Sequence, residues 1–164
     1  MTSPSNPKVN TLFYGDNLKI LRDYLRSESI ALIYLDPPFN NKETYNVLFK
    51  EKGGKQSAAQ IQAFDDFWHW DDAAEAAYVE LQERSPEVGE AVKAFVAFLG
   101  RNDLTAYLVM MAIRLVELHR VLKDNGSLYL HCDPTASHYL KVILDTIFGP
   151  TRFRNEISWK RTYA

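Results

Sequence analysis

The sequence contains little cysteine, no excess of positive charge and no long hydrophobic run. Its one cysteine, Cys132, excludes an intrachain disulfide framework and is typical of a protein of the reducing cytoplasm. The formal net charge of −2 gives no general attraction to DNA, so a DNA-binding surface would have to be local. No segment resembles a signal peptide, and Arg114 and Glu117 interrupt the longest apolar helical pattern, which argues against a membrane partner.

The most informative segment is an apolar run, Ile30–Leu35, that ends at Asp36, Pro37, Pro38 and Phe39. An unbroken apolar run predicts a strand that is covered on both faces within a parallel sheet. The two prolines fix φ and remove backbone donors, so the strand cannot continue past Asp36. Ligands of open α/β sheets bind at the carboxyl ends of strands, which makes this turn the predicted active site.

This turn suits the chemistry of an exocyclic amine. The Asp36 carboxylate and the Pro37 carbonyl are both acceptors, so together they can hold the two hydrogens of an –NH2 group and aim its lone pair at a methyl donor. Pro38 would fix the turn, and the ring of Phe39 could stack on a base swung out of a duplex. Asp36 could also accept the proton that the amine releases.

The Asp36-Pro-Pro-Phe39 motif, with Gly15-Asp16-Asn17-Leu18 upstream, resembles the catalytic region of DNA methyltransferases that modify amino groups with S-adenosylmethionine. Their motif is [DNS]-P-P-[YFW], and in one subgroup it comes first in the chain. The resemblance extends through residues 68–70, 115–122, 126–133 and 153–160. It implies a Rossmann-like methyltransferase fold of the α/β class, with a partial doubly wound, mainly parallel sheet flanked by helices.

The resemblance also implies roles for individual residues. Asp16, helped by the backbone of Asn17 and Leu18, would hold the adenosine of S-adenosylmethionine, and Asp36 would border the same cofactor. Asp16 could equally be the N-cap of a helix that starts at Asn17, and both interpretations can hold. Aspartate at the first motif position favours N6 of adenine over N4 of cytosine. The substrate would be double-stranded DNA with a flipped base; a homodimer and a cognate restriction enzyme stay open as partners.

The sequence departs from this family in its glycines. The family binds the methionine part of the cofactor with an F-x-G-x-G turn, and none of the seven glycines forms a G-x-G pattern. We therefore expect the chain to be the N-terminal portion of a methyltransferase, without the Gly-rich turn and the DNA-recognition region. Alone it should be inactive and bind S-adenosylmethionine weakly or not at all.

The remaining pattern predicts a flexible leader over 1–10, and part of a catalytic domain over 11–164 with a loop-plus-helical insertion at 40–100. A capping box is predicted to open a helix at Asp72 and Glu75. Strands are predicted at 12–14, 30–35 and 127–131, the last after a turn at 125–126. A mobile loop is predicted at 40–62, and helices at 17–24, 73–84, 86–99, about 103–122 and 134–148.

Two further clusters contain side chains that could bind a metal or DNA. His131, Cys132 and Asp133 with His138 lack the spacing of a zinc site, so we predict no metal and assign Asp133 as the N-cap of the next helix, where it could border the Asp36 crevice. A basic run near the end could contact DNA phosphates or form a solvated strand edge; its candidate residues are Arg154, Lys160 and Arg161.

Three other functions remain open on the sequence. Methyltransferases of RNA bases or of glutamine side chains use a similar turn, usually in an N-P-P-Y form. A non-catalytic DNA-binding or assembly module would tolerate loss of Asp36. A pseudo-enzyme would explain the missing glycine turn.

Overall fold

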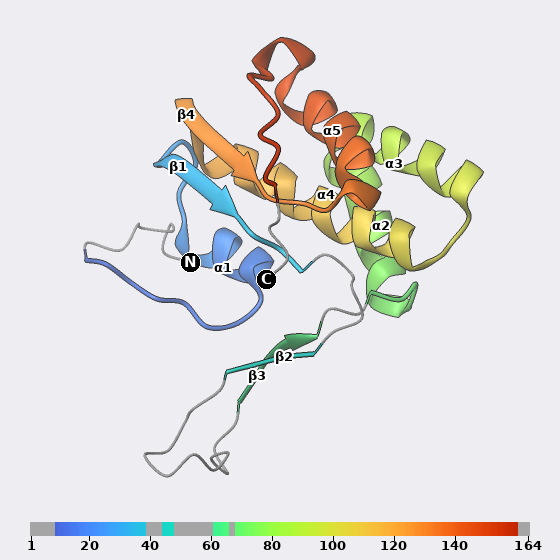
Figure 1. Ribbon diagram of the computed structural model, residues 1–164, viewed down its shortest axis with the longest axis horizontal. Helices are drawn as coiled ribbons and strands as arrows, with labels where there is room; N and C mark the ends of the chain where they lie inside the picture. Colours follow the sequence, from blue (N-terminus) through green and yellow to red (C-terminus); the bar gives the residue numbers. More distant parts are fainter. Residues whose placement is uncertain (1–8, 39–43, 48–60, 66–67, 161–164) are drawn as a thin grey trace.

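The computed structural model describes residues 9–38, 44–47, 61–65 and 68–160. The described part contains two small sheets and a group of helices (Figure 1). The elements in chain order are α1 (Asn17–Tyr24), β1 (Ile30–Leu35), β2 (Thr44–Val47), β3 (Ile61–Asp65), α2 (Asp72–Arg84), α3 (Pro86–Leu99), α4 (Asp103–Val121), β4 (Leu122–Leu130), α5 (Pro134–Phe148) and the 3-10 turn η1 (Pro150–Arg152).

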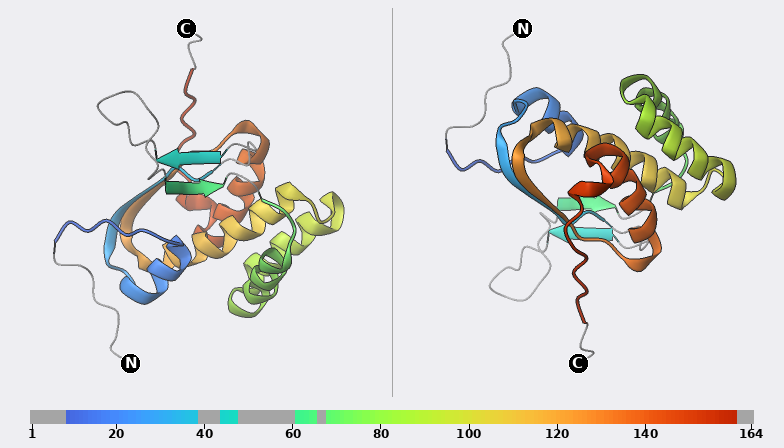
Figure 2. Two further views of the ribbon diagram at one scale, coloured as in Figure 1. Left: turned by 90° about the horizontal axis from the view of Figure 1, so that it is seen from below. Right: turned by 90° about the horizontal axis from the view of Figure 1, so that it is seen from above.

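The main sheet pairs β1 with β4 in parallel, although the helices α2, α3 and α4 separate them in the chain. Both strands therefore end at the same edge of the sheet, as Figures 1 and 2 show. The second sheet is the antiparallel pair β2–β3, which projects away from the helices in Figure 1. This arrangement confirms a mixed fold with a two-stranded parallel sheet flanked by helices.

Helix α4 forms the centre of the core. It begins with a capping box in which the Asn102 side chain accepts from the Thr105 N–H and the Thr105 hydroxyl accepts from the Asn102 N–H. Most apolar side chains of α4 are buried, and those of Leu108 and Leu115 are fully buried. The helix packs against α1, α2, α3 and α5, so it fixes the helices around the sheet. None of the described helices is long and apolar enough to cross a membrane.

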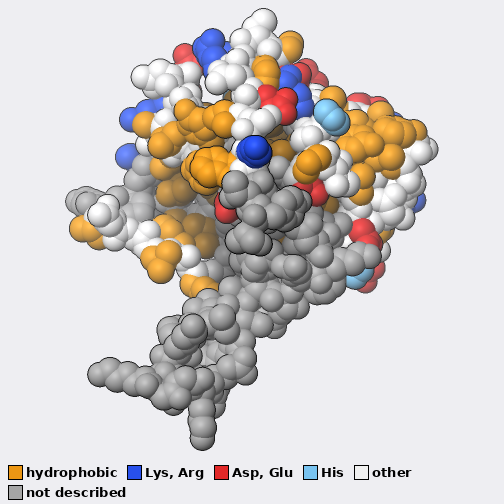
Figure 3. All heavy atoms as spheres, in the orientation of Figure 1, with side chains coloured by type: hydrophobic (Ala, Val, Ile, Leu, Met, Phe, Trp, Pro, Cys, Tyr) orange, Lys and Arg blue, Asp and Glu red, His pale blue; other side chains and the backbone are white. Residues whose placement is uncertain are grey.

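The prediction that both faces of β1 are covered is wrong. Ile33 is buried, but Leu32 is 61% exposed and Tyr34 is 67% exposed. On β4, Tyr129 lies opposite Tyr34 and is 47% exposed. Within the described residues the helices cover one face of the sheet, and hydrophobic side chains gather around these strands on the surface seen in Figure 3.

Three local predictions also need correction. Residues 12–14 form no strand, because no described strand pairs with them, and Leu12 is 96% exposed. The predicted loop at 40–62 contains β2 and the first residues of β3. Helix α2 is capped by Asp71, one residue before the predicted capping box, because the Asp71 carboxylate accepts from the Ala74 N–H.

The predicted turn at 125–126 lies inside β4 instead of before it. The register between β1 and β4 shifts there, because one residue of β1, Ala31, lies opposite residues 123–126. A side chain at Gly126 would come within 2.6 Å of Leu122 Cδ1, so glycine permits this close bulge. The helices predicted at 17–24, 86–99 and 134–148 are confirmed at both ends.

Candidate active site at the strand ends

The predicted catalytic carboxylate lies directly after β1. The side chain of Asp36 is 62% exposed, and Pro37 and Pro38 are partly buried beside it. Strand β1 ends at Leu35, as the two prolines require. Phe39 lies outside the residues that the structure describes, so its stacking role stays a prediction.

The structure brings a histidine to this carboxylate. The His131 N–H donates to the Leu35 carbonyl at 2.8 Å, which extends the ladder one residue beyond the last paired residues of β1 and β4. His131 Nδ1 then lies 3.2 Å from Asp36 Oδ1, and the His131 side chain is 53% exposed. The sequence pattern places His131 at the end of a predicted strand and not in a metal site, but it assigns no role to its side chain; the available signal was that two predicted strands end next to Asp36 and at His131.

The neighbouring residues have structural roles. The Asp133 carboxylate accepts from the Ala136 N–H at 3.1 Å, so Asp133 is the N-cap of α5, as predicted. Burial raises the pKa of the Cys132 thiol, with smaller contributions from Asp133 and Glu156, so the thiol is protonated at neutral pH. No three His, Cys, Asp or Glu side chains in the described parts of the chain are grouped as metal ligands.

The second predicted acid, Asp16, is the N-cap of α1. Its Oδ1 accepts from the Leu18 N–H at 2.8 Å. The same carboxylate also binds Arg114 of α4, whose Nη2 lies 3.0 Å from Oδ1 and 3.2 Å from Oδ2. Arg114 Nε donates to Asn17 Oδ1 at 2.8 Å and Nη1 donates to the Met110 carbonyl at 3.0 Å. One arginine therefore fixes the first two residues of this predicted cofactor segment.

Arg114 belongs to this cluster but is not found from the sequence pattern, which shows it only as an interruption of an apolar helix. Its side chain is 12% exposed, whereas that of Asp16 is 55% exposed. Burial lowers the pKa of Arg114, and Asp16 partly offsets this effect. The buried guanidinium thus holds a carboxylate that still faces solvent.

The two acids lie toward the same edge of the sheet. Helix α1 runs opposite to the direction of β1 in the views of Figures 1 and 2, so its start lies on the side toward which β1 points. Asp16 precedes the first residue of α1, and Asp36 follows the last residue of β1. The arrangement leaves both carboxylates able to accept hydrogen bonds from a ligand at this edge.

The predicted basic segment is exposed and contains no strand among its described residues. Arg154 and Lys160 are exposed, whereas Arg161 lies outside the described residues. The neighbouring Arg152 instead pairs with Asp124 at 3.3 Å. The alternative of a solvated strand edge is therefore wrong as far as Lys160, and the phosphate contacts stay a prediction.

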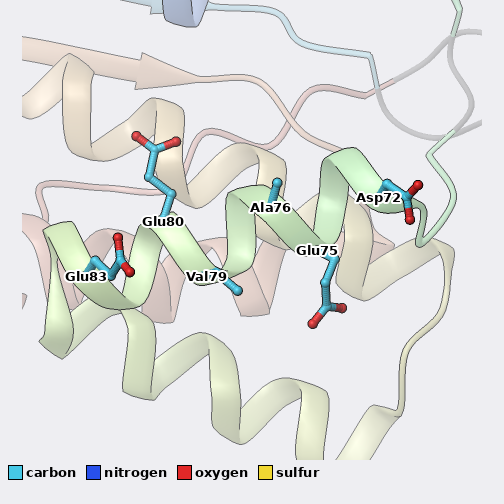
Figure 4. Close-up of a pocket in the computed structure, with 6 residues that line it drawn as sticks. All are labelled: Asp72, Glu75, Ala76, Val79, Glu80 and Glu83. Carbon is cyan, nitrogen blue, oxygen red and sulfur yellow. The ribbon is translucent and has the colours of Figure 1, made fainter.

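A surface hollow along α2 has the wrong charge for DNA. Figure 4 shows that its lining comes from one helix, with Glu75 and Glu80 pointing in different directions. Its lining residues are Asp72, Glu75, Ala76, Val79, Glu80 and Glu83. Four carboxylates would repel phosphate, and none of these residues follows β1 or β4.

The chain is similar to known proteins along most of its length. Residues 30–164 match a family described as DNA methylase. The chain is 26% identical over 163 residues to the Mod subunit of the type III restriction-modification enzyme StyLTI of Salmonella typhimurium, covering 98% of the chain and 22% of the relative. It is 27% identical over 153 residues to the type II methyltransferase M.EcaI of Enterobacter cloacae, covering 93% of the chain and 24% of the relative. The chain thus spans about a quarter or less of the length of these relatives.

Proposed function

Because this chain belongs to the family of DNA methylases of the N6-adenine and N4-cytosine type, we propose that the protein transfers a methyl group from S-adenosylmethionine to N6 of adenine in DNA. One observation carries the proposal: an open carboxylate, Asp36, follows a parallel strand and precedes two prolines. In this family such a position suits an acceptor for the hydrogens of an exocyclic amine. The surrounding fold would be the Rossmann-like sheet that the sequence predicts.

Asp36 and the Pro37 carbonyl would hold the two amine hydrogens, while Pro38 keeps the turn rigid. The sulfonium of S-adenosylmethionine supplies an activated methyl group. As the amine nitrogen bonds to the methyl carbon, the carbon–sulfur bond breaks and its electron pair stays on sulfur. Asp36 then accepts the surplus proton of the nitrogen. Phe39 would stack on the flipped base and keep it outside the duplex.

Asp16 fits the role of holding the adenosine. Its carboxylate is more than half exposed, and it can accept from the amino group of an adenine ring. The Leu18 N–H donates to this carboxylate and orients it, and the Arg114 side chain donates to both Asp16 and Asn17. These contacts support a preformed acceptor at the start of α1.

Adenine is preferred to cytosine because the family motif begins with aspartate in this chain. N4-methylation of cytosine is the second candidate and would use the same residues. Arg154, Lys160 and Arg161 would contact phosphates of the double-stranded DNA. A relative is named as a Mod subunit of a restriction-modification enzyme, which supports a cognate restriction enzyme as partner and leaves a homodimer to be tested.

The test is nucleoside mass spectrometry on DNA from cells that express the complete reading frame, beside an Asp36→Ala control. We expect N6-methyladenine with the unchanged protein and its loss in the control. Detection of N4-methylcytosine instead would support the same mechanism, with cytosine as the target base. The absence of both products, although the protein is folded, would contradict the proposed function.

A further inference from the structure

We propose that His131 is a positioning residue, which holds the Asp36 carboxylate so that one oxygen contacts the histidine and the other faces the target amine. This inference rests on the proposed methyl transfer. It assigns a role to a side chain that the sequence pattern places only at the end of a predicted strand. The juxtaposition of Nδ1 and Oδ1 at 3.2 Å carries it.

The backbone enforces this juxtaposition. Leu35 and Leu130 are paired in the register of the parallel sheet, so the next residues of the two strands are Asp36 and His131. The 2.8 Å hydrogen bond from the His131 N–H to the Leu35 carbonyl locks that pair of strand ends together. A contact between two exposed side chains is ordinarily weak, but here the sheet places both Cα atoms before the side chains meet.

The contact suits a carboxylate that must present one oxygen. The two atoms lie within ion-pair distance, and a histidine whose Nδ1 carries a proton can donate to Asp36 Oδ1 once the ring faces it, in either the neutral or the charged form. That donation restricts rotation of the carboxylate and directs Oδ2 to the amine. In the transfer, the nitrogen gains the methyl carbon, sulfur keeps the electron pair of the broken bond, and the nitrogen's proton passes to Asp36. His131 takes no proton, so the step balances with these groups alone.

A second histidine–carboxylate contact provides a matched control. His69 Nδ1 lies 2.9 Å from Asp103 Oδ1, and the His69 side chain is 66% exposed. This pair joins the segment before α2 to the first residue of α4 instead of the two strand ends. His69→Ala removes a histidine–carboxylate contact that is shorter than the one His131→Ala removes, and it leaves the proposed site intact.

The experiment compares the full-length wild type with His131→Ala, His131→Asn and His69→Ala. We expect His131→Ala to lower kcat about 10- to 100-fold, the range for a hydrogen bond to a charged group, with KM for DNA and cofactor within about twofold. His131→Asn should restore most of kcat, because its amide nitrogen can replace Nδ1 as donor. His69→Ala should retain the wild-type kcat.

A kcat of His131→Ala equal to that of His69→Ala would overturn the inference, as would a rise in KM alone. Nitrogen NMR of the His131 ring gives a readout that does not need activity: Nδ1 should carry the proton in the wild type and lose this preference in Asp36→Ala. An unchanged ring in Asp36→Ala also contradicts the inference. A wild type that methylates no DNA contradicts the proposed function and this inference with it, whereas an active wild type with an unaffected His131→Ala contradicts only the inference.

Discussion

Asp36 at the end of β1 and Asp16 at the start of α1 are held in different ways. Asp36 is 62% exposed, and its contact with His131 joins two exposed side chains at the ends of paired strands. Asp16 is fixed by its own cap and by Arg114, whose side chain is 12% exposed. The first carboxylate is presented by the backbone of a sheet, and the second is clamped by a buried cation.

This difference matches the two proposed tasks. An acid that holds a reacting amine must reach the substrate and accept a proton during the reaction. An acid that holds a cofactor gains from being fixed beforehand, because a preformed site loses less conformational freedom on binding. The comparison therefore predicts that changes at Asp36 affect turnover, and changes around Asp16 affect folding and cofactor binding.

The largest effect is expected at Asp36. In the full-length protein, Asp36→Ala should lower kcat by about 10³-fold, within the usual range for loss of an acid–base group. Because the side chain is exposed, the free energy of unfolding should change by less than about 0.5 kcal/mol. Steady-state methylation and urea unfolding measure both quantities. Wild-type turnover in Asp36→Ala would place Asp36 outside the proposed chemistry. A large loss of stability would show instead that Asp36 supports the fold.

Removal of Arg114 should act on stability first. Arg114→Ala removes the guanidinium that donates to Asp16, Asn17 and the Met110 carbonyl and leaves Asp16 only its cap to the Leu18 N–H, so we expect the free energy of unfolding to fall by about 1–3 kcal/mol. Lys93→Ala is the control, since Lys93 is 55% exposed and pairs with the exposed Glu90; it should cost less than about 1 kcal/mol. Equal losses in the two variants, measured by urea unfolding, would show that Arg114 is no clamp.

The smallest overall effect is expected at Asp16 itself. Asp16→Asn keeps an oxygen that can cap α1 but removes the charge that pairs with Arg114, so the loss should be about 1 kcal/mol or less. Affinity of the full-length protein for S-adenosylmethionine should fall about tenfold, the loss of one charge-assisted contact. Asp23→Ala, an exposed acid of the same helix, serves as control in calorimetry. Unchanged affinity in Asp16→Asn would remove Asp16 from the cofactor site.

The helices were predictable where local signals mark their ends. Asp16 and Asp133 cap α1 and α5, and Pro86 opens α3, so each boundary depends on side chains within one turn. The position of Asp36 at a strand end followed equally from its two prolines. These features depend on nearby residues and need no knowledge of the fold.

The missed features depend on residues far apart in the chain. Arg114 and Asp16 are 98 positions apart, and nothing local shows that α4 lies against the start of α1. The contact between His131 and Asp36 requires that β1 and β4 be neighbours, which strand patterns alone do not fix. The prediction that both faces of β1 are covered failed for the same reason, because an apolar run does not show how many faces of a strand other elements cover.

The central claim is that the Asp36 turn directs a methyl group to an exocyclic amine of DNA. The most direct measurement incubates the purified full-length protein with S-adenosylmethionine carrying a deuterated methyl group and with unmethylated double-stranded DNA, followed by nucleoside mass spectrometry. The account predicts deuterated N6-methyladenine with the wild type and none with Asp36→Ala. Deuterated methyl groups in DNA at the same level from both proteins, or none from a folded wild type, would contradict it.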